Sequence, residues 1–575
     1  MDYTIKIGGE AGQGIQTIGE TLVTVFADSG FHIFSHQDYE SRVRGGHNFY
    51  QIRLANKPIS ASRSKIDILV ALDRESIHSH EHELTSHGTI LYDSSMCKFI
   101  REGNNFLDIP FEDLALEHGK DKITVSTVAI GAVLGILGME LDLYNKVISD
   151  TFQERGALVI EENKNAALAG YKYVKQHKKE FPFVMTVKEE KKLLQIGGIE
   201  SIAAGALASG CKFYSAYPMT PSTGIMNHLA AKAVESGVVV EQAEDEIAAI
   251  NMALGASYAG VRAMTGTSGG GFALMTEGLS LAGMTETPIV IAMGQRPGPA
   301  TGLPTRTEQG DLEFLVSAGH GEFPRVIYAP GTPCQAYYLT SKAFDIAEKY
   351  QIPVFILFDT YLADSLWTFE PGELKHHQYH DYRLRGDVFK NQQDYKRYLF
   401  TDSGISPLAV PGDASQVVVV DSDEHDEEGH LVEDGATRVN MVEKRLFKKL
   451  SQIKSEVASP EYYGAPEAQV LLIGWGSTYG VMKEAVDQLA PSMSIAMLHF
   501  CEIYPLPDSV RFDYLSILRE SALPICIELN ATGQFSRLVR AETGFMFEAF
   551  IHRYDGRPFT IEELIGEIHG HLGNV

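Results

Sequence analysis

Short apolar runs that alternate with helical patterns constrain the fold of this chain more than any other feature of its sequence. Near the N-terminus, an apolar run at 4–7 precedes a glycine-rich turn at 8–14 and a helical pattern at 15–27. Two further strand-like runs, 66–71 and 89–92, also alternate with helical segments. This alternation predicts an α/β domain with a mostly parallel sheet, because parallel neighbours are joined by helical crossovers.

The same alternation returns in two later blocks, one at 197–361 and one that starts at 469 and runs to the C-terminus. In the first of these blocks, apolar runs at 212–215, 238–241 and 289–293 are bounded by turn residues. Buried parallel strands have this form. The sequence therefore predicts an α/β protein that is built from several such blocks.

A chain of 575 residues is too long for one hydrophobic core and predicts roughly three or four domains. The changes of pattern place one α/β domain at 1–185, a second at 186–400 and a third at 461–575. Between the last two, the segment 401–460 is polar and includes the acid-rich stretch 421–428. The spacing of these acids is not that of a calcium loop, so the segment is predicted to be a solvated linker.

The excess of acidic residues limits the classes of partner. The sequence has 49 Lys and Arg against 75 Asp and Glu, a formal net charge of −26. Such a surface argues against nucleic acid or an anionic membrane as the partner and favours metabolite chemistry. The longest apolar-rich segment, 125–139, is shorter than the ~20 residues that a membrane span needs. With no signal peptide at its start, the protein is predicted to be cytoplasmic.

The five cysteines lie far apart, and no CxxC motif occurs. This spacing does not suit an iron–sulfur cluster, whose ligands are closely spaced, and it does not indicate a disulfide framework. Each cysteine is therefore predicted to be a small buried hydrophobe, and any cluster used for electron transfer must belong to another chain. The five are Cys97, Cys211, Cys334, Cys501 and Cys526.

The histidine-rich stretch 78–83 is a candidate for a metal site. His78 and His82 are four residues apart, so a divalent ion could bridge them on one face of a helix. The pattern places no third ligand, and the whole stretch is polar, so an exposed helix face is the favoured interpretation. The sequence predicts no metal site in this chain.

The glycine turn after the first strand carries Gly12 and Gly14 in a GxGxxT pattern that ends at Thr17. A dinucleotide-binding turn needs a third glycine for close packing of helix and strand, and this chain lacks it. The turn can still offer backbone N–H groups to an anion at the helix N-terminus. A tight structural turn and a phosphate contact both remain open.

Three motifs within 197–311 carry candidate site residues. Thr220 lies between two prolines, which fix the backbone and the direction of its hydroxyl. Glu246 begins a helix rich in Ala and Gly, so its carboxylate can project into a site. Arg296 follows an apolar strand, where ligands of α/β proteins bind, and can hold a carboxylate. The Gly/Pro-rich loop after it returns the chain to Thr305.

These motifs resemble the α subunit of the 2-oxoacid:ferredoxin oxidoreductases, the thiamine-diphosphate enzymes that make acyl-CoA. The stretch YPMTPST at 217–223 is similar to the YPITPSS signature of the family, with Met219 and Thr223 as departures. The resemblance implies that Glu246 hydrogen-bonds the aminopyrimidine ring of the cofactor and so promotes proton loss from the thiazolium carbon. Glu244 is the alternative carboxylate. The other implied contacts are Tyr217 and Pro218 with the cofactor, and Thr220, Arg296 and Thr305 with the 2-oxoacid, where Arg262 or Arg306 is the alternative to Arg296.

The N-terminal block resembles the γ module of the same enzymes, here fused ahead of the α module. Two glycine-rich stretches, 8–14 and 41–46, carry this resemblance. It implies a module that packs beside the active site and contacts CoA; the candidate contacts are Gly12, Gly14, Arg42 and Arg44. The last block resembles a transketolase C-terminal-like domain, whose expected role is packing and assembly. The implied fold is thus a multidomain α/β protein with a γ-type domain, a pyrimidine-binding domain and a transketolase C-terminal-like domain.

Two features of the β subunit of this family are missing from the chain. It has neither clustered cysteines nor a GDG motif with a downstream asparagine, the pattern that holds Mg²⁺ and the diphosphate. The resemblance therefore implies half an active site, completed by a β subunit that carries the Mg²⁺ and diphosphate site and a 4Fe–4S cluster. It also implies a dimer of αβ heterodimers that passes electrons to ferredoxin.

The implied reaction is the oxidative decarboxylation of a 2-oxoacid on thiamine diphosphate, with CoA and ferredoxin. The γ–α fusion and the loop 296–305 look most like the 2-oxoglutarate type, which forms succinyl-CoA. Pyruvate, branched-chain 2-oxoacids and indolepyruvate are alternative substrates. A synthase-type half-subunit and a non-catalytic dinucleotide-binding regulatory protein are the alternatives of other classes.

Overall fold

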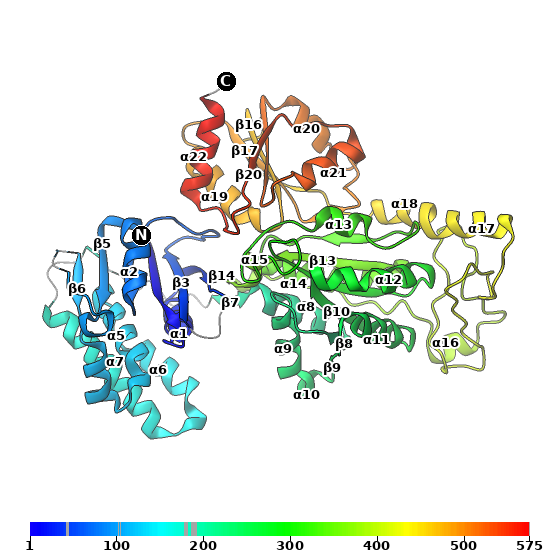
Figure 1. The fold of residues 1–575 in the computed structure, drawn as a ribbon. Coiled ribbons are helices and arrows are strands. Elements are labelled where there is room, and N and C mark those ends of the chain that lie inside the picture. The colour runs from blue at the N-terminus through cyan, green and yellow to red at the C-terminus, as the bar shows by residue number, and fades with distance from the viewer. Residues whose placement is uncertain are drawn as a thin grey trace. The chain divides into compact units, whose positions relative to one another are not determined.

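The computed structural model divides the chain into two compact units (Figure 1). The first comprises Met1–Ile196, Asp364–Glu373 and Thr560–Gly566, and the second comprises Gly197–Ala363, Leu374–Phe559 and Glu567–Val575. The structure describes all residues except 42–44, 102, 104, 178–181, 184, 186–192 and 574–575. The predicted strands and helix near the N-terminus are confirmed, and so is the predicted α/β class.

The first unit is built on an eight-stranded sheet. Its strands are β1 (Asp2–Ala11), β2 (His32–Asp38), β3 (Gly45–Ala55), β4 (Ile66–Ala71), β5 (Leu84–Tyr92), β6 (Phe106–Asp108), β7 (Leu194–Gly197) and β14 (Ser365–Phe369). They lie in the order β6-β5-β4-β1-β3-β2-β14-β7. The strands from β6 to β1 pair in parallel, whereas β1–β3, β3–β2 and β2–β14 are antiparallel.

The expectation of a mostly parallel sheet is therefore wrong for this domain. The physical reason lies in the connection between β2 and β3, which consists of residues 39–44 alone. A parallel pair needs a crossover of a dozen or more residues, so a connection this short can join only antiparallel strands. The alternation of apolar runs did not reveal the antiparallel pairs, because it predicts where strands and helices lie and not the relative direction of paired strands.

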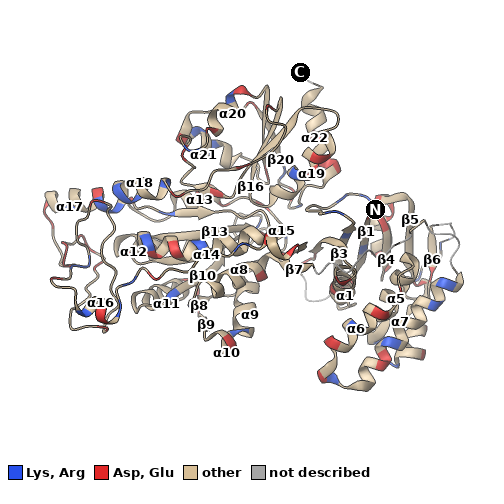
Figure 2. Ribbon diagram, turned by 180° about the vertical axis from the view of Figure 1, so that it is seen from behind, with Lys and Arg blue, Asp and Glu red and all other residues tan. Residues whose placement is uncertain are grey.

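Helix packing completes the core of the first unit. α1 (Ile15–Asp28) packs on the sheet, beside α5 (Val125–Leu137), α6 (Asp142–Thr151) and α7 (Ala157–His177) (Figure 1). Every residue of α5 is buried. A Cβ added at Gly131 of α5 would collide with the backbone of α7, so glycine permits the close approach of these two helices. In Figure 2 the outer helices α6 and α7 carry residues of both charge signs. Within the described part of the chain, no helix has the length and apolarity that a membrane crossing requires.

The second unit contains a seven-stranded sheet that positions the predicted motifs. Its strands are β8 (Cys211–Ala216), β9 (Val239–Gln242), β10 (Arg262–Ser268), β11 (Ile289–Gln295), β12 (Val326–Tyr328), β13 (Pro353–Asp359) and β18 (Glu502–Tyr504). The order is β18-β12-β13-β11-β10-β8-β9, and all neighbours are parallel except the pair β12–β18. The flanking helices are α8 (Gly198–Ala208), α9 (Thr223–Ala231), α11 (Glu246–Tyr258), α12 (Gly269–Met284) and α14 (Pro333–Tyr350). The parallel strands expected for this block are confirmed.

A third sheet, also in the second unit, has five strands in the order β15-β17-β16-β19-β20. They are β15 (Glu461–Gly464), β16 (Val470–Trp475), β17 (Ile495–Phe500), β19 (Leu523–Glu528) and β20 (Ala549–His552). One hydrophobic cluster joins both sheets of this unit, with Phe272 and Leu357 on one side and Trp475 and Phe535 on the other. The C-terminal block is thus packed firmly against the block that precedes it.

The segment 401–460 is not the solvated linker that its composition suggested. It contains α17 (Gly435–Val442) and α18 (Lys449–Lys454), joined by a π-helical turn, and this helical stretch lies along the second unit (Figure 1). The lysines Lys444 and Lys449 are both 1% exposed and form ion pairs with Glu286, which is equally buried. Hydrogen bonds in a π-helical turn span five residues. Lys444 and Lys449 are five residues apart, so the turn brings both side chains onto the same face of the helix. The domain limits themselves stay a prediction.

Glu286 forms ion pairs with both of these lysines, so it should dominate the attachment of this segment. Burial raises the pKa of its carboxyl, but both lysines outweigh this and hold the pKa well below its usual range. We predict that Glu286→Gln lowers the free energy of unfolding by about 3–5 kcal/mol, because it leaves two buried ammonium groups without their counter-ion. Urea unfolding measures this change. Glu443→Gln, at an exposed position on the same helical stretch, is the matched control and should shift the midpoint little; equal effects of both changes would contradict the prediction.

Candidate active site

The predicted motifs lie at one edge of the seven-stranded sheet. Thr220 follows β8, Glu246 follows β9, and Arg296 follows β11. These strands are parallel, so their carboxyl ends meet at the same edge. In open α/β sheets, ligands bind in the crevice outside this edge. The fold therefore gathers residues that are far apart in the sequence.

Glu246 is a buried carboxylate at the first turn of α11. The N-cap residue Asp245 accepts a hydrogen bond from the backbone N–H of Ala248 at 2.7 Å, which fixes where the helix begins. Glu246 itself is only 4% exposed, whereas Glu244 is exposed. A Cβ added at Gly271 of α12 would lie 2.5 Å from Oε1 of Glu246. The carboxyl thus reaches the start of α12, and burial favours Glu246 over Glu244 as the functional acid.

Thr220 and Arg296 are brought together by a direct hydrogen bond. Nη1 of Arg296 donates to the backbone carbonyl of Thr220 at 2.9 Å. The loop at Thr220 also rests on β11, because a Cβ added at Gly294 would lie 2.7 Å from Cγ of Pro221. Burial lowers the pKa of the half-buried Arg296, while the carboxyl of Asp311 acts in the opposite direction. The other N–H groups of the guanidinium and the hydroxyl of Thr220 have no hydrogen-bond partner among the described residues, so they can receive a ligand.

The remaining predicted residues of this site are less tightly defined. Tyr217 directly follows β8 and is 40% exposed, and Pro218 beside it is half-buried. Thr305 is half-buried on the loop that starts at Arg296, and it makes no hydrogen bond within the described residues. The structure therefore shows contact between Thr220 and Arg296, and it shows none between Thr305 and either of them.

The loop that carries Thr305 is anchored by Gln309, a residue that the sequence interpretation missed. Gln309 is fully buried, and its Nε2 donates to the carbonyl of Trp475 at 2.8 Å. Its Oε1 accepts from the N–H of Leu529 at 3.0 Å, and its carbonyl accepts from Nδ2 of Asn530 at 3.1 Å. The C-terminal block thus holds the loop in place. The sequence feature that could have indicated Gln309 is the polar run at 308–311, directly after the Gly/Pro-rich stretch.

Arg262, an alternative partner for the substrate carboxylate, is not available for that role. It is 4% exposed, and its guanidinium bonds Asp345 at 2.7 Å and Glu348 at 2.9 Å. A buried guanidinium that already serves two carboxylates has a structural role. Arg306 lies on the same loop as Thr305 and is half-buried.

In the first unit, the glycine turn has the conformation that only glycine adopts readily. Gly12 and Gly14 have φ of 95° and 79°, and Gly14 is the N-cap of α1. A Cβ at Gly12 would meet nothing within 4 Å, so this side of the turn is open to a ligand. Arg42 and Arg44 lie outside the described residues.

The histidine stretch 78–83 differs in part from its interpretation as an exposed polar face. His78 and His82 are exposed, but His80 between them is buried. Its Nε2 lies 2.8 Å from Nε2 of His47, and its Nδ1 lies 3.0 Å from Oε2 of Glu83. The exposed face that the spacing of His78 and His82 indicated is thus confirmed, and the buried His80 pairs with the half-buried His47.

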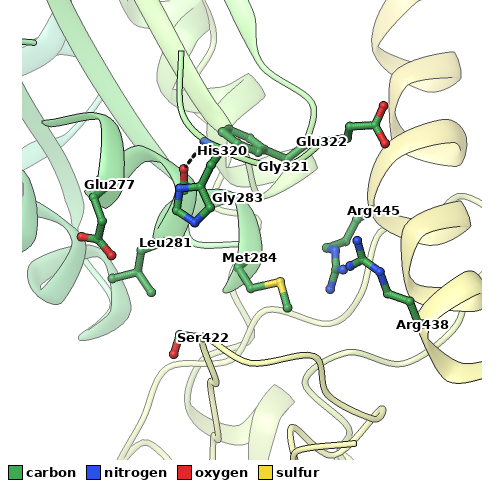
Figure 3. A pocket seen from close by; sticks show the side chains of 12 residues that line it. Glu277, Leu281, Gly283, Met284, His320, Gly321, Glu322, Ser422, Arg438 and Arg445 are labelled. Carbon is green, nitrogen blue, oxygen red and sulfur yellow. Dashed lines mark hydrogen bonds between the residues drawn. The ribbon is translucent and has the colours of Figure 1, made fainter. Parts of the chain in front are cut away.

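A cavity of about 270 Å³ lies elsewhere in the second unit, and none of the predicted site residues lines it. Figure 3 shows Arg438 and Arg445 extending toward it from one helix, opposite Glu277, Met284 and His320. Both arginines are paired with Glu424. The two cationic side chains of this cavity are therefore already paired within the chain.

Comparison with known proteins identifies two families that match parts of this chain. Residues 204–444 match the family described as "Pyruvate flavodoxin/ferredoxin oxidoreductase, thiamine diP-bdg", and residues 4–173 match "Pyruvate ferredoxin/flavodoxin oxidoreductase". The 2-oxoacid:ferredoxin oxidoreductase subunit alpha of Sulfolobus sp is 32% identical over 98% of this chain and 96% of that protein. The 2-oxoglutarate oxidoreductase subunit KorA of Mycobacterium tuberculosis is 28% identical over 94% of this chain and 87% of that protein.

A solved structure extends the likeness to the whole fold. The 2-oxoglutarate:ferredoxin oxidoreductase from Magnetococcus marinus, with 2-oxoglutarate, coenzyme A and succinyl-CoA bound, has a TM-score of 0.90 and 31% identity over 99% of both chains. The chain belongs to the α subunits of the 2-oxoacid:ferredoxin oxidoreductases. It is therefore one subunit of an oxidoreductase and contains a thiamine diphosphate-binding domain.

The contact between Glu246 and α12 yields a matched test of the site geometry. We predict that Gly271→Ala displaces both the Thr267 hydroxyl and the Glu246 carboxyl, whose oxygens would both lie within 2.5 Å of the new methyl carbon. The chain should be destabilised by about 1–3 kcal/mol, because the methyl group overpacks a buried position. Gly270→Ala is the control, since its Cβ would meet only the carbonyl of Ala300 at 3.9 Å. Thermal unfolding and a crystal structure of each variant measure the two effects. An unmoved Glu246 in the Gly271 variant would contradict the assigned geometry.

Proposed function

We propose that this chain is a fused γ–α subunit that acts with a separate β subunit in the oxidative decarboxylation of a 2-oxoacid, with CoA and ferredoxin as co-substrates. The preferred substrate is 2-oxoglutarate, and the product is succinyl-CoA. The observation that carries the proposal is the buried carboxylate of Glu246 at the same sheet edge as the bonded pair Thr220 and Arg296. The relative from Magnetococcus marinus, which holds 2-oxoglutarate and succinyl-CoA, supports this substrate.

The residues around Glu246 fit thiamine diphosphate. Glycine at position 271 keeps open the space that the Glu246 carboxyl enters, and Ala249 and Ala253 let α11 pack closely beneath it. When bound, thiamine diphosphate supplies the carbon nucleophile and the electron sink for loss of CO₂. Glu246 holds and releases the proton of the hydrogen bond to the aminopyrimidine nitrogen. Tyr217 and Pro218, at the end of β8, border the same cofactor.

Arg296 holds the carboxylate of the 2-oxoacid. Its bond to the Thr220 carbonyl fixes the guanidinium and leaves other N–H groups for a charge-assisted hydrogen bond. The Thr220 hydroxyl and Thr305 complete the polar contacts of the substrate. The anchor at Gln309 supports this assignment, because it restrains the loop that carries Thr305.

The glycine turn of the first unit contacts CoA. Gly12 and Gly14 expose backbone N–H groups at the start of α1, where an anionic phosphate is stabilised. Arg42 and Arg44, from the neighbouring glycine-rich stretch, are the proposed charge partners of the same phosphates. The 4Fe–4S cluster belongs to the β subunit, since the five cysteines of this chain are widely spaced. The Mg²⁺ and diphosphate site belongs there too, since this chain has no GDG motif with a downstream asparagine.

An uncharged apolar surface beside Glu246 supports a partner at this edge. Ile247 and Met252 of α11 are 50% and 42% exposed, and Leu274 of the adjacent α12 is 51% exposed. No charged residue occurs in 247–261, between Glu246 and Arg262. Exposed apolar surface on neighbouring helices is typical of an interface, so the β subunit covers α11 and α12 here. The assembled enzyme is a dimer of αβ heterodimers.

Reconstitution with the β subunit tests the proposed function. The two chains are co-expressed, and reduction of ferredoxin is measured with a panel of 2-oxoacids in the presence of CoA. The highest kcat/KM is expected for 2-oxoglutarate. Preference for pyruvate, a branched-chain 2-oxoacid or indolepyruvate would correct the substrate, and absence of turnover with every 2-oxoacid would reject the reaction.

Glu246→Gln should abolish turnover and leave assembly intact. Glutamine keeps the size of the side chain but cannot exchange a proton with the cofactor, and such acid–base roles contribute about a hundred- to ten-thousand-fold in rate. The rate of the reconstituted complex measures the loss, and size-exclusion chromatography checks assembly. Glu244→Gln, at an exposed position of the preceding loop, is the control. Loss of turnover in Glu244→Gln, with normal turnover in Glu246→Gln, would assign the catalytic role to Glu244 instead.

Arg296→Ala should lower kcat/KM for the 2-oxoacid with thiamine diphosphate content unchanged. A charge-assisted hydrogen bond of this kind contributes about 1.5–3 kcal/mol to binding. Arg296→Lys should restore only part of the loss, because an ammonium group lacks the planar fork of guanidinium. Steady-state kinetics and cofactor analysis separate the two effects. Parent-like kinetics in both variants would place the carboxylate elsewhere, with Arg306 as the next candidate.

Ile247→Lys combined with Leu274→Lys should prevent association with the β subunit. Two ammonium groups in an apolar interface would be buried without a partner, which is strongly unfavourable. Val234→Lys is the control, because Val234 is fully exposed on α10 (Ala233–Ser236). Co-purification of the tagged chain measures association. Normal recovery of the β subunit with the double variant would show that it docks on another surface.

A further inference from the structure

Asp311 lies at the end of the loop that begins with Arg296, directly before α13 (Leu312–Ser317). Its backbone N–H donates to Oε1 of Gln295 at 3.1 Å, which ties it to the residue that precedes Arg296. Its side chain makes no capping bond to α13. The backbone is therefore fixed while the carboxyl is left for another purpose.

The carboxyl of Asp311 lacks the partners that a buried carboxylate needs. Its Oδ2 is buried without a hydrogen-bond partner among the described residues. Its Oδ1 lies against the start of α12, since a Cβ added at Gly269 would be 2.9 Å away. A buried acid without donors is costly as an anion, and such a group either keeps a proton or meets a ligand.

The charges around Asp311 come from two residues. Burial raises the pKa of its carboxyl to about 6, the like charge of Glu308 adds to this shift, and Arg296 opposes it. Glu308 belongs to the same loop, and its own pKa is raised by burial. Gln295 and Gly269, on the elements packed against Asp311, carry no charge, while Glu313 of α13 is paired with Arg537 at 2.9 Å. Asp311 and Arg296 thus influence each other electrostatically, but within the described residues they form no salt bridge.

We propose that Asp311 is a further substrate-binding residue of the reaction proposed above: it carries a proton when the 2-oxoacid anion is bound at Arg296, and its O–H donates to that anion. This inference rests on the proposed function. The unpartnered Oδ2 is the atom that carries the proton and donates it in a hydrogen bond to the substrate carboxylate held by Arg296. An ionised Asp311 would repel the anion and compete for Arg296, so substrate binding takes up a proton.

The sign of the pH dependence follows from this coupling. Below the raised pKa of about 6, Asp311 is already neutral, and the 2-oxoacid binds without proton uptake. Above this pKa, the fraction of chains with a protonated Asp311 falls by up to about tenfold per pH unit. KM for the 2-oxoacid should therefore rise by up to about tenfold per pH unit. The value of kcat should change much less over the same range, because the saturated complex already holds the proton.

Steady-state kinetics of the reconstituted complex from about pH 5.5 to about pH 8.5 test the inference. Asp311→Asn should give a low KM that no longer rises with pH, because an amide donates a hydrogen bond without titrating. Glu308→Gln should start the rise at lower pH, since it removes the like charge that raises the pKa of Asp311. Glu313→Gln, two residues from Asp311, is the control and should keep the parent profile.

The outcomes separate this inference from the proposed function. A parent complex that turns over no 2-oxoacid overturns the proposed function. A parent complex that is active but has a KM independent of pH overturns the role of Asp311 alone. A rise of KM that persists unchanged in Asp311→Asn also overturns it. If Asp311→Asn does not fold, the Glu308→Gln variant decides. A dependence of KM on pH identical to that of the parent would contradict the electrostatic coupling between Glu308 and Asp311 and overturn the inference.

Discussion

The parallel direction of the strands in the seven-stranded sheet is the constraint on which the rest of the chemistry depends. Thr220, Glu246 and Arg296 are separated by dozens of residues, yet each follows a strand of this sheet. Parallel strands end at one edge, so the three motifs reach the same crevice without any direct link in sequence. A reversal of one strand would carry its motif to the opposite edge and separate Arg296 from Glu246.

Close backbone approach is the second requirement, and the start of α12 satisfies it with consecutive glycines. The carboxyl of Glu246 lies where a side chain at position 271 would stand, and the carboxyl of Asp311 lies where one at position 269 would stand. Two acids therefore border the same helix start. Their surroundings differ: Glu246 is buried at the start of α11, while the carboxyl of Asp311 is under the influence of the charges of Arg296 and Glu308.

Buried ionic groups fasten the outer segments to this core. Glu286 holds two lysines from a segment more than 150 residues later, and Arg262 bonds two carboxylates of α14. Composition marked the first of these segments as solvated, because charged residues usually are. This interpretation failed for a physical reason. A charged side chain can be buried when a counter-ion from a distant part of the chain pairs with it, and the sequence does not show which residues pair.

The sequence by itself determined the α/β class, the parallel strands of the second sheet and the family, because apolar periodicity and short motifs are local properties. It also pointed to Glu246, since a carboxylate ahead of small helical residues is visible in the chain. The tertiary structure decided the antiparallel half of the first sheet, the burial of Lys444 and Lys449, the anchor at Gln309 and the orphaned carboxyl of Asp311. Each of these depends on which distant groups come into contact, and such contacts follow from packing in three dimensions and not from the order of the residues.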